Sequence, residues 1–135
     1  MGKENIEAKK EYLKKYEEAV RQAERCRLRI EEIRLRRIIA PVVNDGMPHA
    51  KNKSDLSGYA AILEQEEKRY MKYRHNRAMK CKKITDRVER MEDEDEKDIL
   101  IYRYIKLMKW YDICDKMGYS RQQVYRVHER ALKNF

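Results

Sequence analysis

The sequence contains few of the residues that interrupt helices or build sheets. Its 135 residues include only 4 glycines and 2 prolines, and only 1 phenylalanine and 1 tryptophan accompany the 10 tyrosines. No alternating run of β-branched residues predicts a strand. Charged residues make up 42% of the chain, and such a composition is typical of long helices rich in Glu, Lys and Arg. We therefore expect an all-α protein with a modest hydrophobic core.

The sequence also lacks the signatures of membrane, secreted and metal-binding proteins. No apolar run approaches the roughly 18 residues of a membrane span, and the start has no apolar segment of a signal peptide. The 3 cysteines, Cys26, Cys81 and Cys114, form no Cys-x-x-Cys pair, so neither a disulfide framework nor a zinc site is predicted. We expect a cytoplasmic protein with reduced cysteines, no metal, no cofactor and no membrane partner.

Positive charge dominates the chain, whose formal net charge is +9 at pH 7. Residues 68–83 contain no acid but carry the basic residues Lys68, Arg69, Lys72, Arg74, Arg77, Lys80, Lys82 and Lys83. A polyanion such as DNA suits this surface, because neutralising phosphates releases their condensed counterions. A solvated helix face on a merely basic protein is the other interpretation, and charge alone leaves both open.

Two long amphipathic helices are predicted before residue 93. In residues 1–40 the apolar positions recur mostly at intervals of three and four: Ile6, Leu13, Tyr16, Val20, Ala23, Cys26, Ile30, Ile33 and Ile38. Pro41 ends this helix. Residues 54–92 carry a second stripe that includes Leu56, Leu63, Tyr70, Ile84 and Met91, with Ser54 as the expected N-cap. The two stripes predict either an antiparallel hairpin or a dimeric coiled coil.

The segment between these helices, residues 41–53, is expected to be a linker. It contains both prolines and the turn signal Asn44-Asp45-Gly46. Its length exceeds that of a usual connection, which favours a mobile or functional segment.

Residues 93–135 predict a domain of short helices. The acids of residues 93–98 favour a helix N-terminus, and the apolar residues from Ile99 to Met108 are expected to form the apolar face of one helix. A short helix from Trp110 to Met117 then stops at Gly118, where a left-handed residue fits. Ser120 and Gln123 have the spacing of a capping box and open a last helix that runs to Asn134. A short helix, a turn with glycine and a capped basic helix predict a helix-turn-helix.

In this motif the start of the second helix enters the major groove, where Arg can bind guanine and Gln can bind adenine. The expected base-reading residues are Arg121, Gln122, Tyr125 and Arg126, with Gln123 divided between capping and contact. The expected phosphate contacts are Ser120, Arg130, Lys133, Lys72 and Lys80. The expected core of the motif is Ile105, Trp110, Ile113, Cys114, Met117, Val124, Val127 and Leu132. A plain three-helix core with a basic surface is the alternative.

The run from Ile113 to Ser120, followed by Gln123-Val124-Tyr125-Arg126-Val127-His128 and Ala131-Leu132, resembles region four of bacterial sigma factors. The same run is more similar to the ArpU/RinA-like phage proteins from Gram-positive hosts. The layout of those proteins is also matched by Arg103-Tyr104-Ile105 and Trp110. The resemblance covers about residues 48–135 and is strongest over 99–132. Cys114 departs from the sigma pattern, which usually has Ala there. No polymerase-binding or −10-melting segment precedes the motif, so a complete sigma factor is not expected.

This resemblance implies a phage-encoded regulator of late transcription in a bacterial host cell. Arg121, Gln122, Tyr125 and Arg126 match sigma-factor positions that face the −35 element. The implied partners are double-stranded DNA and RNA polymerase. A homodimer through the long helices would match two half-sites about one helical turn apart.

Two other functions remain open at this point. A phage terminase small subunit also pairs a helix-turn-helix with an oligomerising helical region, and a protein-docking module would act on RNA polymerase through the hairpin. An enzyme is not expected, because no phosphate-cradling loop, nucleophile elbow or metal motif is found. His128 is interpreted as a packing or phosphate-contacting residue, not as a metal ligand.

Overall fold

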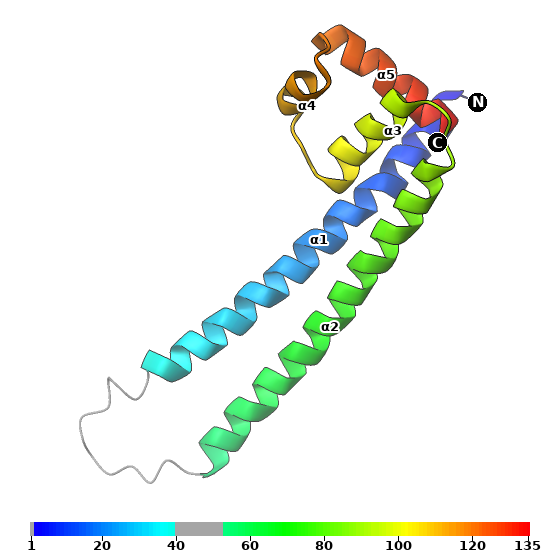
Figure 1. Ribbon diagram of the computed structural model, residues 1–135. Coiled ribbons are helices and arrows are strands. Elements are labelled where there is room, and N and C mark those ends of the chain that lie inside the picture. The colour runs from blue at the N-terminus through cyan, green and yellow to red at the C-terminus, as the bar shows by residue number, and fades with distance from the viewer. Residues whose placement is uncertain (1, 40–52) are drawn as a thin grey trace. The chain divides into compact units, whose positions relative to one another are not determined.

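The computed structural model describes residues 2–39 and 53–135, and within these it describes the side chains of residues 5–36 and 58–135. The predicted linker, apart from Lys53, lies outside the described residues. The elements are α1 (Gly2–Ile39), α2 (Lys53–Glu89), α3 (Glu94–Leu100), the π-helical turn η1 (Ile101–Ile105), α4 (Trp110–Met117) and α5 (Arg121–Asn134) (Figure 1). The prediction of an all-α fold is confirmed: two long helices precede a group of short ones, and the described ranges contain no strand.

The chain divides into two compact units, and both long helices contribute to each. We call residues 20–76 the hairpin unit, and residues 1–19 together with 77–135 the head unit. The helix-turn-helix therefore belongs to a compact unit that also contains the start of α1 and the end of α2. Among the described helices, none has the length and the hydropathy that a membrane span requires.

Within the hairpin unit α1 and α2 run antiparallel (Figure 1). The apolar stripe of α1 is largely buried, and the stripe of α2 is half-buried. Ala23, Cys26 and Ile30 of α1 are buried, and the thiol of Cys26 lies 3.6 Å from the carbonyl oxygen of Glu66 on α2. Of the two arrangements that the stripes left open, the chain adopts the hairpin. The start of α2 lies one residue before Ser54, which was expected to precede the helix as its N-cap.

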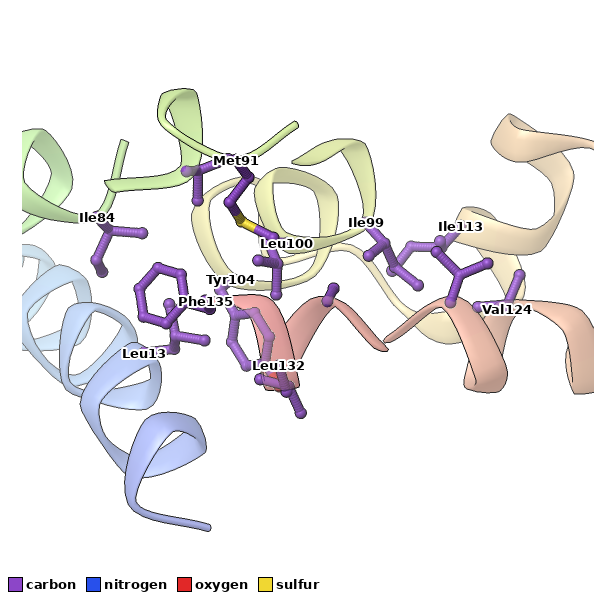
Figure 2. Close-up of a cluster of buried hydrophobic side chains, with 13 residues drawn as sticks. Leu13, Ile84, Met91, Ile99, Leu100, Tyr104, Ile113, Val124, Leu132 and Phe135 are labelled. Atoms are coloured by element: carbon purple, nitrogen blue, oxygen red, sulfur yellow. The ribbon is translucent and has the colours of Figure 1, made fainter. Parts of the chain in front are cut away.

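The head unit has one continuous core to which five helices contribute (Figure 2). Its most deeply buried side chains are Leu13 of α1, Ile84 and Val88 of α2, Ile99 and Leu100 of α3, Ile113 of α4, and Val124 and Leu132 of α5. The aromatic rings of Tyr104 and Phe135 pack into the same cluster. Because removing apolar side chains from water is the main force that orders a small domain, α3, α4 and α5 are fixed relative to one another.

The expectation of one helix through Met108 was wrong, because the helical segment changes character at Ile101 and ends at Ile105. The amide of Lys106 donates to the carbonyl of Ile101 at 2.8 Å, which is the wider i→i+5 bond of a π-helical turn. Leu107 follows with a φ of 55°, a left-handed conformation that reverses the chain. The guanidinium group of Arg103 closes this turn by donating to the carbonyl of Met108 at 3.0 Å.

Candidate nucleic-acid interface

The connection between α4 and α5 has the geometry of a helix-turn-helix turn. α4 ends at Gly118, whose φ of 70° and ψ of 26° lie in the left-handed region that glycine adopts at little cost. The amide of Gly118 donates to the carbonyl of Cys114 at 2.9 Å, and the amide of Tyr119 donates to the same carbonyl at 3.2 Å. The predicted glycine stop is thus confirmed, and it sets the direction in which the next helix leaves.

The predicted capping box at the start of α5 is also confirmed. The hydroxyl of Ser120 accepts from the amide of Gln123 at 3.3 Å, and the side-chain oxygen of Gln123 accepts from the amide of Ser120 at 3.0 Å. The carboxamide of Gln123 is therefore engaged at the cap through its oxygen, which leaves its NH₂ group for a contact. The first turn of α5 is fixed before any partner arrives.

α5 has one buried and one exposed face. Val124, Val127, Ala131 and Leu132 are buried in the head core, as the spacing predicted. Of the other expected core residues, Ile113 is buried, and Ile105, Trp110, Cys114 and Met117 are partly buried against the cluster. The expected base-reading residues, Arg121, Gln122, Gln123, Tyr125 and Arg126, are all exposed. The structure thus brings these five side chains together on the first two turns of one helix.

Arg121 and Tyr125 form a pair on the exposed side of α5. The Nε of Arg121 donates to the hydroxyl of Tyr125 at 3.0 Å, one helical turn away. The ring of Tyr125 in turn meets the ring of Trp110 edge to face, with centroids 5.4 Å apart. Because the terminal nitrogens of Arg121 are not used in this bond, the pair holds the guanidinium group in place and leaves donors for a ligand.

A cavity of about 480 Å³ lies beside Arg126 in the head unit. Its lining is mixed in charge and consists of Asp95, Tyr119, Gln123, Arg126, Val127, Glu129 and Arg130. The hydroxyl of Tyr119 donates to the carboxylate of Asp95 at 2.6 Å, and this hydrogen bond raises the pKa of Tyr119. The turn residue is thereby tied to the first turn of α3, a contact that spacing along the sequence could not reveal.

The expected phosphate contacts fall into two groups. Ser120, Arg130 and Lys133 are exposed at the start and along the length of α5. Lys72 is exposed on α2 in the hairpin unit, whereas Lys80 is half-buried on α2 in the head unit. The first three therefore share a helix with the expected base-reading residues, and the last two do not.

His128 lies in the core, which agrees with the packing interpretation. It is 9% exposed, and its Nε2 lies 2.7 Å from the hydroxyl of Tyr104. Its ring also meets that of Trp110 edge to face at 4.7 Å. Burial, together with the positive charges of Lys10 and Arg103, lowers the pKa of His128 to about 4. A neutral, buried imidazole joins η1, α4 and α5, and it is not placed to contact a phosphate.

Three further contacts that position α5 were not predicted. The ammonium group of Lys9 donates to the backbone oxygen of Lys133 at 2.9 Å. The side-chain amide of Asn134 donates to both carboxylate oxygens of buried Glu96 at 3.0 Å each. The guanidinium group of Arg87 lies 4.0 Å from the ring centroid of Phe135. Each contact joins α5 to a helix far away in sequence, and no local pattern signals such pairs.

A family model described as "Protein of unknown function (DUF1492)" matches residues 43–135, which include α2 and the whole helix-turn-helix. Neither a curated protein nor a solved structure matches the chain.

Proposed function

The chain belongs to the DUF1492 family, and we propose that it is a sequence-specific protein that binds double-stranded DNA through α5. The observation that carries this proposal is the two-faced α5 with its fixed start. One face is buried in the head core, while Arg121, Gln122, Tyr125 and Arg126 are exposed directly after the capping box. A recognition helix needs this combination of a rigid support and polar side chains at its N-terminal end.

The exposed side chains suit the major groove of B-DNA. Arginine can donate two hydrogen bonds to O6 and N7 of guanine, and glutamine can pair with N6 and N7 of adenine. Arg126 and Gln122 lie on the side of the helix that faces away from Val124 and Val127, so they are the leading candidates for base contacts. Ser120, Arg130 and Lys133 would bind phosphates on either side and fix the position of the helix in the groove.

The biological role that we propose is regulation of phage or prophage transcription. It rests on the resemblance of residues 99–132 to ArpU/RinA-like proteins and to sigma region four. In this proposal the protein acts in the cytoplasm of the bacterial host, with DNA and RNA polymerase as its partners. If two copies of the protein pair, the DNA target should contain two half-sites.

Selection from a pool of random duplexes tests the proposal. The full chain is incubated with the pool at about physiological salt, and the bound duplexes are amplified and sequenced over several rounds. We expect one enriched motif with guanine or adenine at the positions that Arg126 and Gln122 read. Recovery of unselected sequence at every round would overturn the sequence-specific function.

A matched selection with the Arg126→Ala variant assigns the contact. This variant removes one exposed side chain and leaves the capping box and the buried face of α5 intact. Its enriched motif should lose preference at one base pair and keep the others. An identical motif from the variant would show that α5 does not read DNA in the proposed way.

A further inference from the structure

The hairpin unit contains a cavity whose lining is dominated by arginine. Its volume is about 240 Å³, several times the ~30 Å³ that one water molecule occupies in the liquid. The lining residues are Gln22, Arg25, Cys26, Arg29, Arg69 and Tyr73. All six belong to residues 20–76, so the cavity lies within one compact unit and is separate from the helix-turn-helix.

Helical spacing places these side chains on one side of the hairpin. Gln22, Arg25 and Arg29 are three and four residues apart on α1, and Arg69 and Tyr73 are four apart on α2. Residues at these intervals are neighbours on a helix surface. Three guanidinium groups therefore converge on one depression from two antiparallel helices, with an amide and a phenol beside them.

The positive charge in this cavity exceeds the negative charge near it. Glu66, which is largely buried, has one carboxylate oxygen 3.8 Å from a terminal nitrogen of Arg29 and 3.8 Å from one of Arg69. These distances permit ion pairing but exceed hydrogen-bond length. In the described ranges, Arg25 has no acid within ion-pairing distance. The cavity thus has three guanidinium groups in its lining, and the one carboxylate of Glu66 lies near two of them.

Nearby arginines are arranged differently. Arg27 donates to Glu31 at 2.6 Å and to Glu24 at 3.0 Å, and Arg34 donates to Glu67 at 2.9 Å. The three arginines of the cavity make no such hydrogen bond to the part of the chain that the structure describes. Each guanidinium group carries five N–H donors in a planar fork that suits the oxygens of a phosphate.

We propose that this cavity binds a phosphate group. Arg25, Arg29 and Arg69 supply positive charge and paired N–H donors. The hydroxyl of Tyr73 and the side-chain amide of Gln22 belong to the same lining and can donate to another oxygen of the phosphate. The phosphate is either one of a DNA backbone or that of a small free ligand. The site does not depend on the proposed role of α5; only its assignment to DNA rests on the proposed function.

An NMR titration of the full chain with inorganic phosphate tests the site directly. Chloride keeps the ionic strength constant, and the Nε–Hε signals of the arginines and the side-chain amide of Gln22 are followed. We expect saturable shifts that are concentrated at Gln22, Arg25, Arg29 and Arg69. Shifts spread evenly over the arginines of the chain, or none that saturate, would overturn the proposal.

Two variants with the same change of charge sharpen this test. Arg25→Gln removes a guanidinium group from the cavity without breaking either pair to Glu66, so the hairpin should remain folded. Arg36→Gln removes one from an exposed position on the same helix outside the cavity. We expect at least tenfold weaker phosphate binding in Arg25→Gln and unchanged binding in Arg36→Gln. Equal affinities in the two variants would overturn the assignment.

Binding to a random duplex over a series of salt concentrations identifies the source of the phosphate. If the cavity holds a backbone phosphate, Arg25→Gln lowers the slope of log affinity against log salt by about 0.9 relative to Arg36→Gln. An equal slope, with phosphate shifts retained in the wild type, assigns the cavity to a free phosphate ligand. A chain that binds no DNA but shows these shifts would contradict the proposed function and leave this site supported.

Discussion

The hydroxyl of Tyr104 and the Nε2 of His128 are joined by a hydrogen bond of 2.7 Å in the core of the head unit. Their rings stack with centroids 5.7 Å apart. Burial raises the pKa of Tyr104 to about 12 and, with Lys10 and Arg103 nearby, lowers that of His128 to about 4. Both side chains are therefore neutral at pH 7, and the pair links η1 to α5 without placing a charge in the core.

We expect the protein to lose stability in mild acid because of His128. Its pKa in the folded state is about 4, below the ~6.5 of an unfolded histidine, so protons bind preferentially to the unfolded chain between these values. The free energy of unfolding should fall as pH decreases from about 6.5 to 4, by on the order of 3 kcal/mol. Urea unfolding at several pH values in this window measures the loss.

Direct titration separates His128 from other groups. The NMR titration of its ring should have a midpoint near 4, well below the ~6.5 of a histidine in an unfolded chain. The His75→Gln variant should retain the loss of stability in acid. A midpoint for His128 near 6.5 in the folded protein would contradict this prediction.

Gly118→Ala should destabilise the head unit. The residue has a φ of 70°, and no heavy atom lies within 4 Å of an added Cβ, so the cost arises from the left-handed backbone alone. That cost is about 1–2 kcal/mol. Gly58→Ala is the matched control, because Gly58 lies inside α2 and also has open space around it. It should stabilise the protein by about 0.5–1 kcal/mol. Equal shifts in thermal unfolding for both variants would refute the argument.

Arg126→Ala should weaken binding to the selected DNA by about 1–3 kcal/mol, because one bidentate base contact is lost. Binding to random duplex should change much less. Titration of both duplexes at one salt concentration gives the two values. An equal loss on both would mean that Arg126 contacts only the backbone.

Lys72→Gln and Lys80→Gln should weaken binding to selected and random DNA alike, unlike Arg126→Ala. If these residues contact phosphates, each substitution weakens binding to every duplex and lowers the salt slope by about 0.9. Lys14→Gln, at an exposed position of α1, provides a control with the same change of charge. A slope that falls equally in Lys14→Gln would indicate a general effect of net charge and not a contact.

Periodic and local features were the ones that the sequence predicted well. The two apolar stripes, the stop at Gly118 and the capping box at Ser120 depend on residues within one or two helical turns of each other. Burial of Val124, Val127 and Leu132 follows from the same spacing. These features also place Arg121, Gln122 and Arg126 on the exposed part of α5, so the candidate interface could be located from the sequence.

Features without a regular sequence pattern, and features that depend on distant partners, could not be predicted. The π-helical turn after Leu100 and the left-handed Leu107 are stabilised by Arg103, whose target is a backbone carbonyl. The arginine-lined cavity needs α1 and α2 to be paired in register, since Arg25 and Arg69 are 44 residues apart in sequence. The choice between a hairpin and a coiled coil likewise needed the structure.

The fully buried Leu13 has a consequence for how the protein is made. The core cluster to which it belongs also contains Ile99, Ile113 and Leu132, which leave the ribosome up to roughly 120 residues later. At translation rates of about 5–20 residues per second, the delay is on the order of 10 s. Ile84 and Val88 of α2 are the first members of this cluster to follow Leu13, and the cluster is complete only when α5 has emerged. Nascent chains should therefore be most prone to aggregation or chaperone capture just before α5 emerges.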